Sequence, residues 1–134
     1  MRKLALALTL AAGCSSASSE TVKQDAAVKL VTAQVLPDMK GDKLKATVLE
    51  VSYPPGGSSS AHRHPCPVIG YILEGRYRTQ VEGSPATIYQ KGDTFYEPAN
   101  GVHQVSANAS TTEPVRFLAY FLCDSDAPLS APAP

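Results

Sequence analysis

The 134-residue sequence has no excess of charge of either sign, because Lys and Arg together number 12 and Asp and Glu together also number 12. Proteins that bind nucleic acid normally carry a basic excess, so the composition offers no electrostatic case for such a partner. The sequence also lacks an internal repeat, a coiled-coil heptad pattern and a Gly-rich phosphate loop. What remains is a chain of ordinary globular composition, 43% hydrophobic and 18% charged, whose length suits one domain.

Helix signals are also scarce, whereas the chain contains 11 prolines and 9 glycines. Short apolar or alternating segments separated by these turn residues predict an all-β fold. A sandwich or barrel is expected because it leaves few unpaired strand edges. The segments that we expect to contain strands are 28–36, 44–53, 68–73, 77–82, 86–89, 94–97, 103–107 and 115–122.

The N-terminus contains an apolar run that is too short to span a bilayer. Arg2 and Lys3 precede this run, and Ala-Gly then precedes Cys14, a pattern typical of a bacterial export signal. A cysteine after Ala-Gly also resembles a lipobox, so lipidation of Cys14 is one hypothesis and plain signal cleavage is the other. We therefore expect residues 1–20 to be an export or lipoprotein signal with a tether. The protein would lie in the periplasm or on the outer surface, attached to a membrane only through a Cys14 lipid.

All three histidines lie in two short segments. His62 and His64 form an H-x-H pair, and residues two apart on a strand point to the same face. His103 from another strand would supply a third imidazole and leave open positions on a metal ion, which suits catalysis better than structural closure. The alternative is a surface H-x-H pair with an unrelated third histidine.

The glycines and prolines around the histidines form two spaced patterns, Gly56-x5-His62-x-His64-x10-Gly75 and Gly92-x5-Pro98-x4-His103. Together they resemble the two motifs of the cupin superfamily, and the strings at 71–75 and 95–98 are similar to those of small single-domain bacterial cupins with the type-2 conserved barrel. Val68 stands where the first motif has a glutamate ligand. Asn100 stands where the second motif has a glycine, and asparagine also tolerates positive φ.

The resemblance implies an all-β, single-domain jelly-roll barrel, also called a double-stranded β-helix. We expect this cupin domain over residues 21–123 and a flexible Pro/Ala-rich tail over 124–134. By resemblance, the three histidines would hold a divalent transition metal inside the barrel, and the protein would be a homodimer that binds a small molecule. Imidazole ligands suit Fe, Zn, Ni, Cu or Mn, and the sequence does not choose among them.

The missing glutamate makes Glu97 a candidate catalytic residue. Its carboxylate could bind the metal, hydrogen-bond a ligating imidazole or accept a proton from a substrate. The alternative is a glutamate at the rim that pairs with Arg63 or Lys91.

Further residues are candidates for the substrate pocket. Val68 replaces the usual ligand and would face the site, and five aromatic residues could line it: Tyr53, Tyr71, Phe95, Tyr96 and Phe121. The alternative for these aromatic residues is an ordinary place in the core.

In the jelly-roll order that the resemblance implies, segments 68–73 and 115–122 lie antiparallel, which brings Cys123 toward Cys66. A disulfide requires their Cα atoms to lie within about 7 Å. Two free thiols, or a Cys66 thiolate bound to the metal, are the alternatives.

These inferences lead to two main hypotheses about function. The first is a metal-dependent, dioxygenase-like enzyme, in which the metal binds a phenolic, enolic or keto-acid substrate that then reacts with O2, as the resemblance implies. The second is a non-catalytic module that binds a metal or a small ligand. A metal-free barrel with a structural role is a third alternative.

Overall fold

The computed structural model describes residues 29–41 and 43–134, so the expected signal segment and Cys14 lie outside the described part of the chain. Within that part, no helix is long and apolar enough to cross a membrane. The strands in chain order are β1 (Lys45–Tyr53), β2 (Ser58–Ser59), β3 (His62–Arg63), β4 (Val68–Glu74), β5 (Arg76–Val81), β6 (Thr87–Gln90), β7 (Thr94–Glu97), β8 (Val102–Asn108), β9 (Val115–Cys123) and β10 (Ala131–Pro132).

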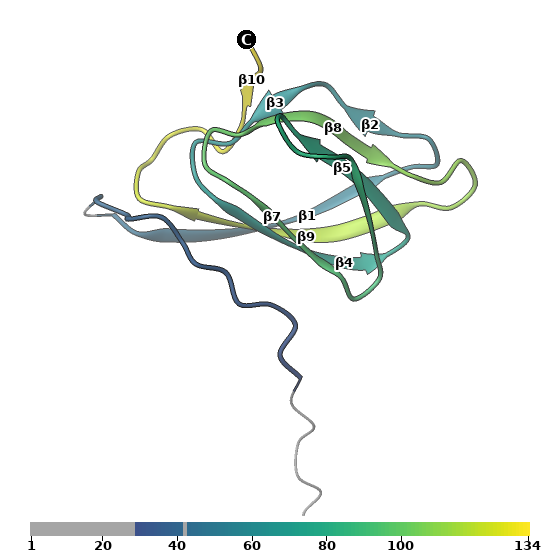
Figure 1. The fold of residues 1–134 in the computed structure, drawn as a ribbon, viewed down its shortest axis with the longest axis horizontal. Coiled ribbons are helices and arrows are strands. Elements are labelled where there is room, and N and C mark those ends of the chain that lie inside the picture. Colours follow the sequence, from purple (N-terminus) through teal and green to yellow (C-terminus); the bar gives the residue numbers. More distant parts are fainter. Residues whose placement is uncertain (1–28, 42) are drawn as a thin grey trace, which may run out of the picture.

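Two antiparallel sheets face each other as two layers (Figure 1). One sheet has the order β1-β9-β4-β7, and the other has the order β10-β3-β8-β5-β6, with β2 also paired to β8. Strands β4 and β9 are neighbours although β9 follows much later in the chain, as the jelly-roll order predicts. The all-β jelly-roll fold expected from the sequence is therefore confirmed.

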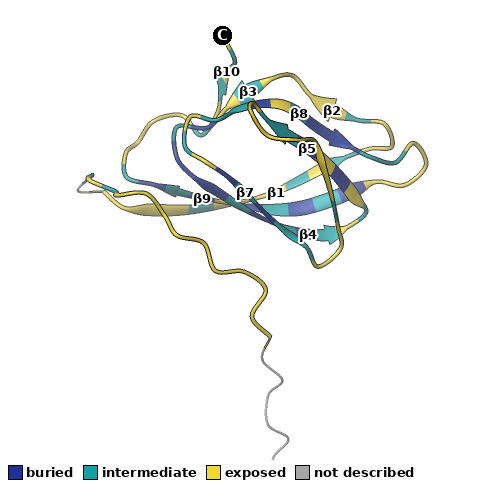
Figure 2. Ribbon diagram, viewed as in Figure 1, coloured by how far each residue is buried: buried dark blue, intermediate teal, exposed yellow. Residues whose placement is uncertain are grey.

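The core lies between the sheets and is built mainly from β4, β7 and β9. In β9 every second residue is buried, from Val115 through Phe117 and Phe121 to Cys123. In Figure 2 the buried residues, in dark blue, lie in strands of both sheets, including β4, β7, β8 and β9. Gly70 in β4 lies opposite Phe95 in β7, and a Cβ at Gly70 would overlap the Phe95 ring. The absence of a side chain at position 70 thus allows Phe95 to pack across the sheet.

An irregularity in β8 turns two inner residues toward the same cavity. His103 pairs with Val81, and Val105 pairs with Gln80, so β8 carries one extra residue at Gln104. Residues three apart on a regular strand point to opposite faces, but a bulge of this kind restores the inward direction. As a result, His103 and Ser106 both line the interior.

Two terminal segments differ from the sequence predictions. Residues 29–36 lie outside both sheets, and Leu30 and Val35 are exposed. The prediction of a strand there was wrong for these residues because β-propensity alone provides no partner strand.

The segment 124–134, expected to be a flexible tail, instead folds back onto the barrel. Its strand β10 pairs with β3, and Leu129 packs against the core. The composition, rich in Pro and Ala, does not reveal that one leucine and two paired residues attach this segment to the barrel.

Candidate metal centre

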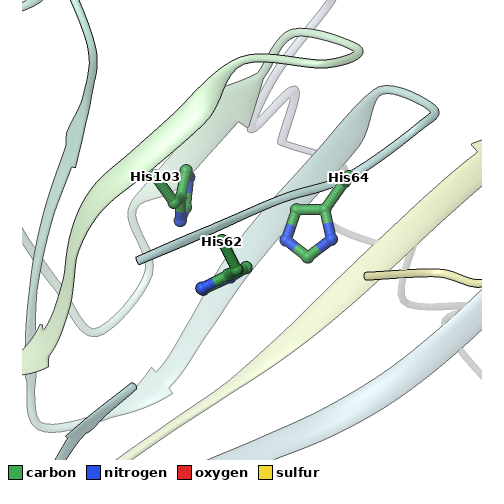
Figure 3. A group of neighbouring side chains, drawn as sticks. All are labelled: His62, His64 and His103. Atoms are coloured by element: carbon green, nitrogen blue, oxygen red, sulfur yellow. The ribbon is translucent and has the colours of Figure 1, made fainter. Parts of the chain in front are cut away.

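The three histidines converge from two neighbouring strands of one sheet. His62 in β3 and His103 in β8 are directly paired across the strands, and His64 follows β3. One ligand nitrogen from each lies within 4.8 Å of the other two. Figure 3 shows the three rings gathered around a common point. His103 is only 2% exposed, so the alternative of unrelated surface histidines does not describe this arrangement.

The backbone around His64 is held by the turn between β7 and β8. The carbonyl of His64 accepts a hydrogen bond of 2.6 Å from the Asn100 amide. Asn100 has a φ of 62°, the left-handed conformation that a glycine or asparagine adopts at low cost. Asparagine at this position therefore fulfils the role of the motif glycine and connects the two histidine segments.

Hydrogen bonds select the ring nitrogens that remain free to bind a metal. The Nδ1 atom of His62 lies 2.8 Å from the carbonyl oxygen of Ser60, and that of His64 lies 2.6 Å from the carbonyl oxygen of Leu129. Because a carbonyl only accepts, each Nδ1 carries the proton and each Nε2 keeps its lone pair. Backbone acceptors of this kind commonly orient metal-binding histidines.

Glu97 points into the histidine group from the opposite sheet. Its Oε1 atom lies 3.1 Å from Nε2 of His103, and its Oε2 atom lies 3.4 Å from Nε2 of His64. The residue is 5% exposed, and its contacts are these two imidazoles instead of Arg63 or Lys91. The structure thus places the predicted carboxylate within the histidine cluster.

The register of β4 and β7 places Glu97 beside the position of the missing motif glutamate. Val68, at the glutamate position, is the direct cross-strand partner of Glu97. Side chains of such a pair share one face of the sheet, with Cβ atoms about 5 Å apart. The carboxylate therefore lies one strand away from the motif position and on the same inner face of the sheet. Three imidazoles and one carboxylate thus face the same region of the barrel interior.

The polar atoms of this group fit a bound cation. Glu97 Oε2 and both ring nitrogens of His103 are fully buried and make no hydrogen bond. Burying a carboxylate oxygen and an imidazole lone pair without partners is costly, whereas a metal ion would satisfy Glu97 Oε2 and one ring nitrogen of His103 together. Nitrogen-rich donors with one carboxylate suit a divalent transition metal better than Mg or Ca.

Burial also changes the protonation of two groups in the cavity. It lowers the pKa of His64, although the Leu129 carbonyl and the charge of Glu97 oppose this shift. It raises the pKa of Tyr77, and the negative charge of Glu97 raises it further. At neutral pH, His64 is therefore available as a neutral ligand, and Tyr77 keeps its hydroxyl proton.

A cavity of about 210 Å³ opens beside the histidines. Its walls are largely apolar, with Val68 and the rings of Phe117 and Phe121 among the lining residues. A cluster of hydroxyl groups, defined here as the hydroxyl cluster, also lines it and consists of Tyr53, Ser59, Tyr77 and Ser106. The Ser106 hydroxyl lies 2.8 Å from that of Tyr77 and 3.0 Å from that of Tyr53, which also contacts Ser59.

Two of the tyrosines proposed for the pocket from sequence do not line this cavity. Tyr71 alternates with the buried residues of β4 and lies on the outer face of the sheet, and Tyr96 alternates with Phe95 and Glu97 in the same way. Of the other aromatic candidates, Tyr53 and Phe121 line the cavity and Phe95 does not, and Tyr77 is a lining residue that was not predicted. The alternation of 77–82 could have indicated Tyr77, because its neighbours Arg76 and Arg78 require solvent.

A disulfide links Cys66 and Cys123, whose Cα atoms are 5.1 Å apart. It connects the segment that follows His64 to the end of β9. Both sulfurs are engaged in this bond, so neither supplies a thiolate ligand to the metal.

Comparison with known proteins places this site in a family. The family model described as the cupin domain matches residues 49–121, which is more than half of the chain. A comparison with curated protein sequences finds no match.

Several solved structures have a similar fold. A cupin-like protein from Thermotoga maritima is 26% identical, with a TM-score of 0.57 over 66% of this chain and 64% of that one. Oxalate decarboxylase from Bacillus subtilis, whose structure was described with Mn(II) centres, is 28% identical, with a TM-score of 0.57 over 65% of this chain and 23% of that one. A DMSP lyase from Ruegeria pomeroyi is 23% identical, with a TM-score of 0.58 over 66% of this chain and 43% of that one.

This chain spans less than two thirds of the length of each of these three proteins. The similarity therefore concerns the barrel and not their whole architecture. Together with the family match over residues 49–121 and the paired motif histidines, it shows that the chain belongs to the cupin family.

Proposed function

We propose that this protein is a metal-dependent cupin that acts on a small, oxygen-bearing organic molecule. The observation that carries the proposal is the convergence of three imidazoles beside a cavity, with Glu97 in contact with two of them and with Glu97 Oε2 and the His103 nitrogens buried without partners. His62, His64 and His103 would hold a divalent transition metal together with one oxygen of Glu97. When bound, such an ion supplies a Lewis acid and, if it is redox active, a centre for oxidation by O2.

The charge of the ligand set favours an anionic substrate group. Three neutral imidazoles and one carboxylate leave a single net positive charge on a divalent ion, so a phenolate, enolate or carboxylate oxygen would complete the neutralisation. The second oxygen of Glu97 would accept the proton that a phenol or enol releases as it binds. Because the pKa of Tyr77 is raised, its hydroxyl would donate a hydrogen bond to the substrate instead of accepting a proton.

The size of the cavity limits the substrate. A cavity of about 150 Å³ accommodates benzene in an engineered protein. A volume of about 210 Å³ therefore suits one small ring, or a short chain, with a few oxygen substituents. Apolar walls and a hydroxyl cluster favour a substrate with one apolar face and one hydrogen-bond acceptor.

Metal analysis of the purified protein tests the proposal. We expect about one transition metal ion per chain, lost in His62→Ala and retained in Gln104→Ala, a matched control at an exposed position beside His103 in β8. O2 consumption with catechols and keto acids would then separate an oxygenase from a binding module. Substoichiometric metal in the unaltered protein after incubation with Fe, Zn, Ni, Cu and Mn would contradict the proposal.

We also propose that the protein is exported and that Cys14 is lipidated. The Cys66–Cys123 disulfide supports an oxidising compartment, since such bonds are rare where thiols are kept reduced. Metabolic labelling with palmitate should mark the protein and should fail for Cys14→Ala. Labelling of neither form would contradict lipidation.

Two copies of the chain are proposed to associate through the outer face of the four-stranded sheet. Val48 and Tyr120 are directly paired and exposed there, and Ile69 extends the same apolar row. Light scattering after size exclusion should give a dimer mass, reduced to the monomer mass by Tyr120→Lys. A monomer mass for the unaltered protein would contradict the dimer.

A further inference from the structure

The segment that follows the disulfide contacts the metal centre at several points. We call residues 127–133 the C-terminal strap. Ala131 and Pro132 in β10 pair with Arg63 and His62 in β3. The strap is therefore the edge strand beside β3, which carries the proposed metal ligand His62. Beyond this strand, the Ala133 amide donates a hydrogen bond of 3.2 Å to the carbonyl of Ala61. The strap thus runs antiparallel to residues 61–63, which include the proposed ligand His62.

Leu129 connects the strap to the second ligand. Its carbonyl oxygen accepts the Nδ1 proton of His64 at 2.6 Å, and its side chain packs against the core. On the other side, the His64 ring meets the edge of Phe121 at a centroid distance of 5.0 Å. The orientation of the His64 ring is therefore determined by one strap carbonyl and one core ring. Leu129 and Ser130 also line the cavity, so the strap closes one of its walls.

The disulfide holds the end of β9, from which the chain continues to the strap, close to His64. Cys123 ends β9 and is separated from the strap by three residues, and Cys66 lies two residues beyond His64. At the same end, the Asp124 carboxylate accepts amide hydrogen bonds from Lys40 and Gly41. The covalent link therefore limits the distance that the segment after Cys123 can move away from His64.

We propose that the C-terminal strap is a positioning element of the metal centre, which keeps the Nε2 lone pair of His64 directed at the metal, and that the Cys66–Cys123 disulfide maintains this position. The proposal rests on the metal site proposed above and adds to it a part of the chain outside both cupin motifs. Loss of an outer hydrogen-bond partner of a metal-bound histidine typically weakens metal binding by about 10- to 100-fold. A similar loss is expected here when the strap is absent, with a smaller loss when only the disulfide is removed.

Metal affinity, measured by competition of Zn²⁺ with a chromophoric chelator, tests the proposal on three variants. A chain that ends at Asp126 removes the strap and should bind Zn²⁺ about 10- to 100-fold more weakly, with a far-ultraviolet spectrum like that of the full chain. Cys66→Ser/Cys123→Ser should weaken binding several-fold. Asp126→Asn is the matched control, because among the described residues this exposed carboxylate pairs only with Lys43 and Lys45, and the substitution should leave the affinity unchanged.

The outcomes distinguish this inference from the proposed function. If the full chain binds no Zn²⁺, the metal site itself is contradicted. If the full chain binds Zn²⁺ and the shortened chain binds it equally tightly, the positioning role is overturned. Unchanged affinity in the double cysteine variant would overturn the role of the disulfide.

A second measurement applies to the full chain and does not depend on the folding of the shortened one. Long-range ¹H–¹⁵N spectra of the metal-free protein should show the His64 proton on Nδ1, with a coupling across the hydrogen bond to the Leu129 carbonyl carbon. A proton on Nε2 of His64 would overturn the proposal.

Discussion

At the residue scale, the proposed chemistry of the centre depends on the position of one carboxylate. Glu97 lies across the strand pair from Val68, which occupies the usual glutamate position. A cupin motif that is read only along the chain therefore lacks one ligand, although the neighbouring strand carries the carboxylate that we propose as its substitute. The sequence justified Glu97 as a candidate, but only the register between β4 and β7 explains why it can take this role.

Exchanging the two residues tests this compensation. Glu97→Val should reduce Zn²⁺ affinity by at least the roughly 10- to 100-fold typical of a lost outer partner, because a direct ligand disappears. The double variant Val68→Glu/Glu97→Val should recover most of the affinity, since the carboxylate returns to the same inner face. Chelator competition measures both, and Glu82→Gln, at an exposed position, is the control. Equal affinities for Glu97→Val and the unaltered protein would show that Glu97 is not a ligand.

Protonation of His64 predicts how stability depends on pH in the metal-free protein. Burial lowers the pKa of His64 below its ordinary value of 6.5, so the unfolded chain binds this proton at a higher pH than the folded chain does. The free energy of unfolding should therefore fall as the pH drops below about 6.5 and should be insensitive to this group above it. Urea titrations from pH 5 to pH 8 measure the effect, and His64→Gln should reduce the slope. A slope of the opposite sign would contradict the burial of a neutral His64.

At the scale of the elements, the packing of β4 against β7 depends on Gly70, which has no side chain. Gly70→Ala would place a Cβ against the Phe95 ring and force either the ring or β7 to move. Overpacking of this kind costs about 1–3 kcal/mol of unfolding free energy. Urea denaturation should detect it, with Gly83→Asn as the control, because no atom lies near a Cβ at Gly83 and asparagine tolerates its positive φ. A full-stability Gly70→Ala variant would contradict this packing.

Most strands could be predicted from sequence because their apolar residues alternate or run continuously between turn residues. Segment 115–122 and segment 94–97 correspond closely to β9 and β7. The bulge at Gln104 could not be predicted, because it becomes evident only when β8 is aligned with β5. Pairing is a property of two strands, and a single strand does not encode the register of its partner.

At the scale of the whole molecule, one covalent bond connects distant parts of the chain around the metal centre. Cys66 and Cys123 are separated by 57 positions, so their bond restricts a large loop in the unfolded state. In the chain-entropy model, a loop of this length corresponds to roughly 4 kcal/mol of stability. Cys66→Ser/Cys123→Ser should therefore unfold at a markedly lower urea concentration than the unaltered protein. A midpoint unchanged by this double substitution would contradict a structural role for the bond.

The sequence identified the barrel and the three histidines, but not the segment that completes the site. Leu129 and Ser130 lie beyond the last predicted strand, in a stretch whose composition suggests a tail. Their role depends on the return of the chain to β3, which follows from three-dimensional pairing. Of the hydroxyl cluster only Tyr53 was a candidate, since Tyr53 and Ser106 come together only across the two sheets.

Three imidazoles and the Glu97 carboxylate are proposed to bind one metal ion. Anomalous X-ray scattering from crystals grown with a transition metal, recorded at the absorption edge of that metal, would locate this ion. A single strong peak is expected within bonding distance of His62, His64, His103 and Glu97. A peak elsewhere, or none at this position in metal-soaked crystals, would contradict the proposal.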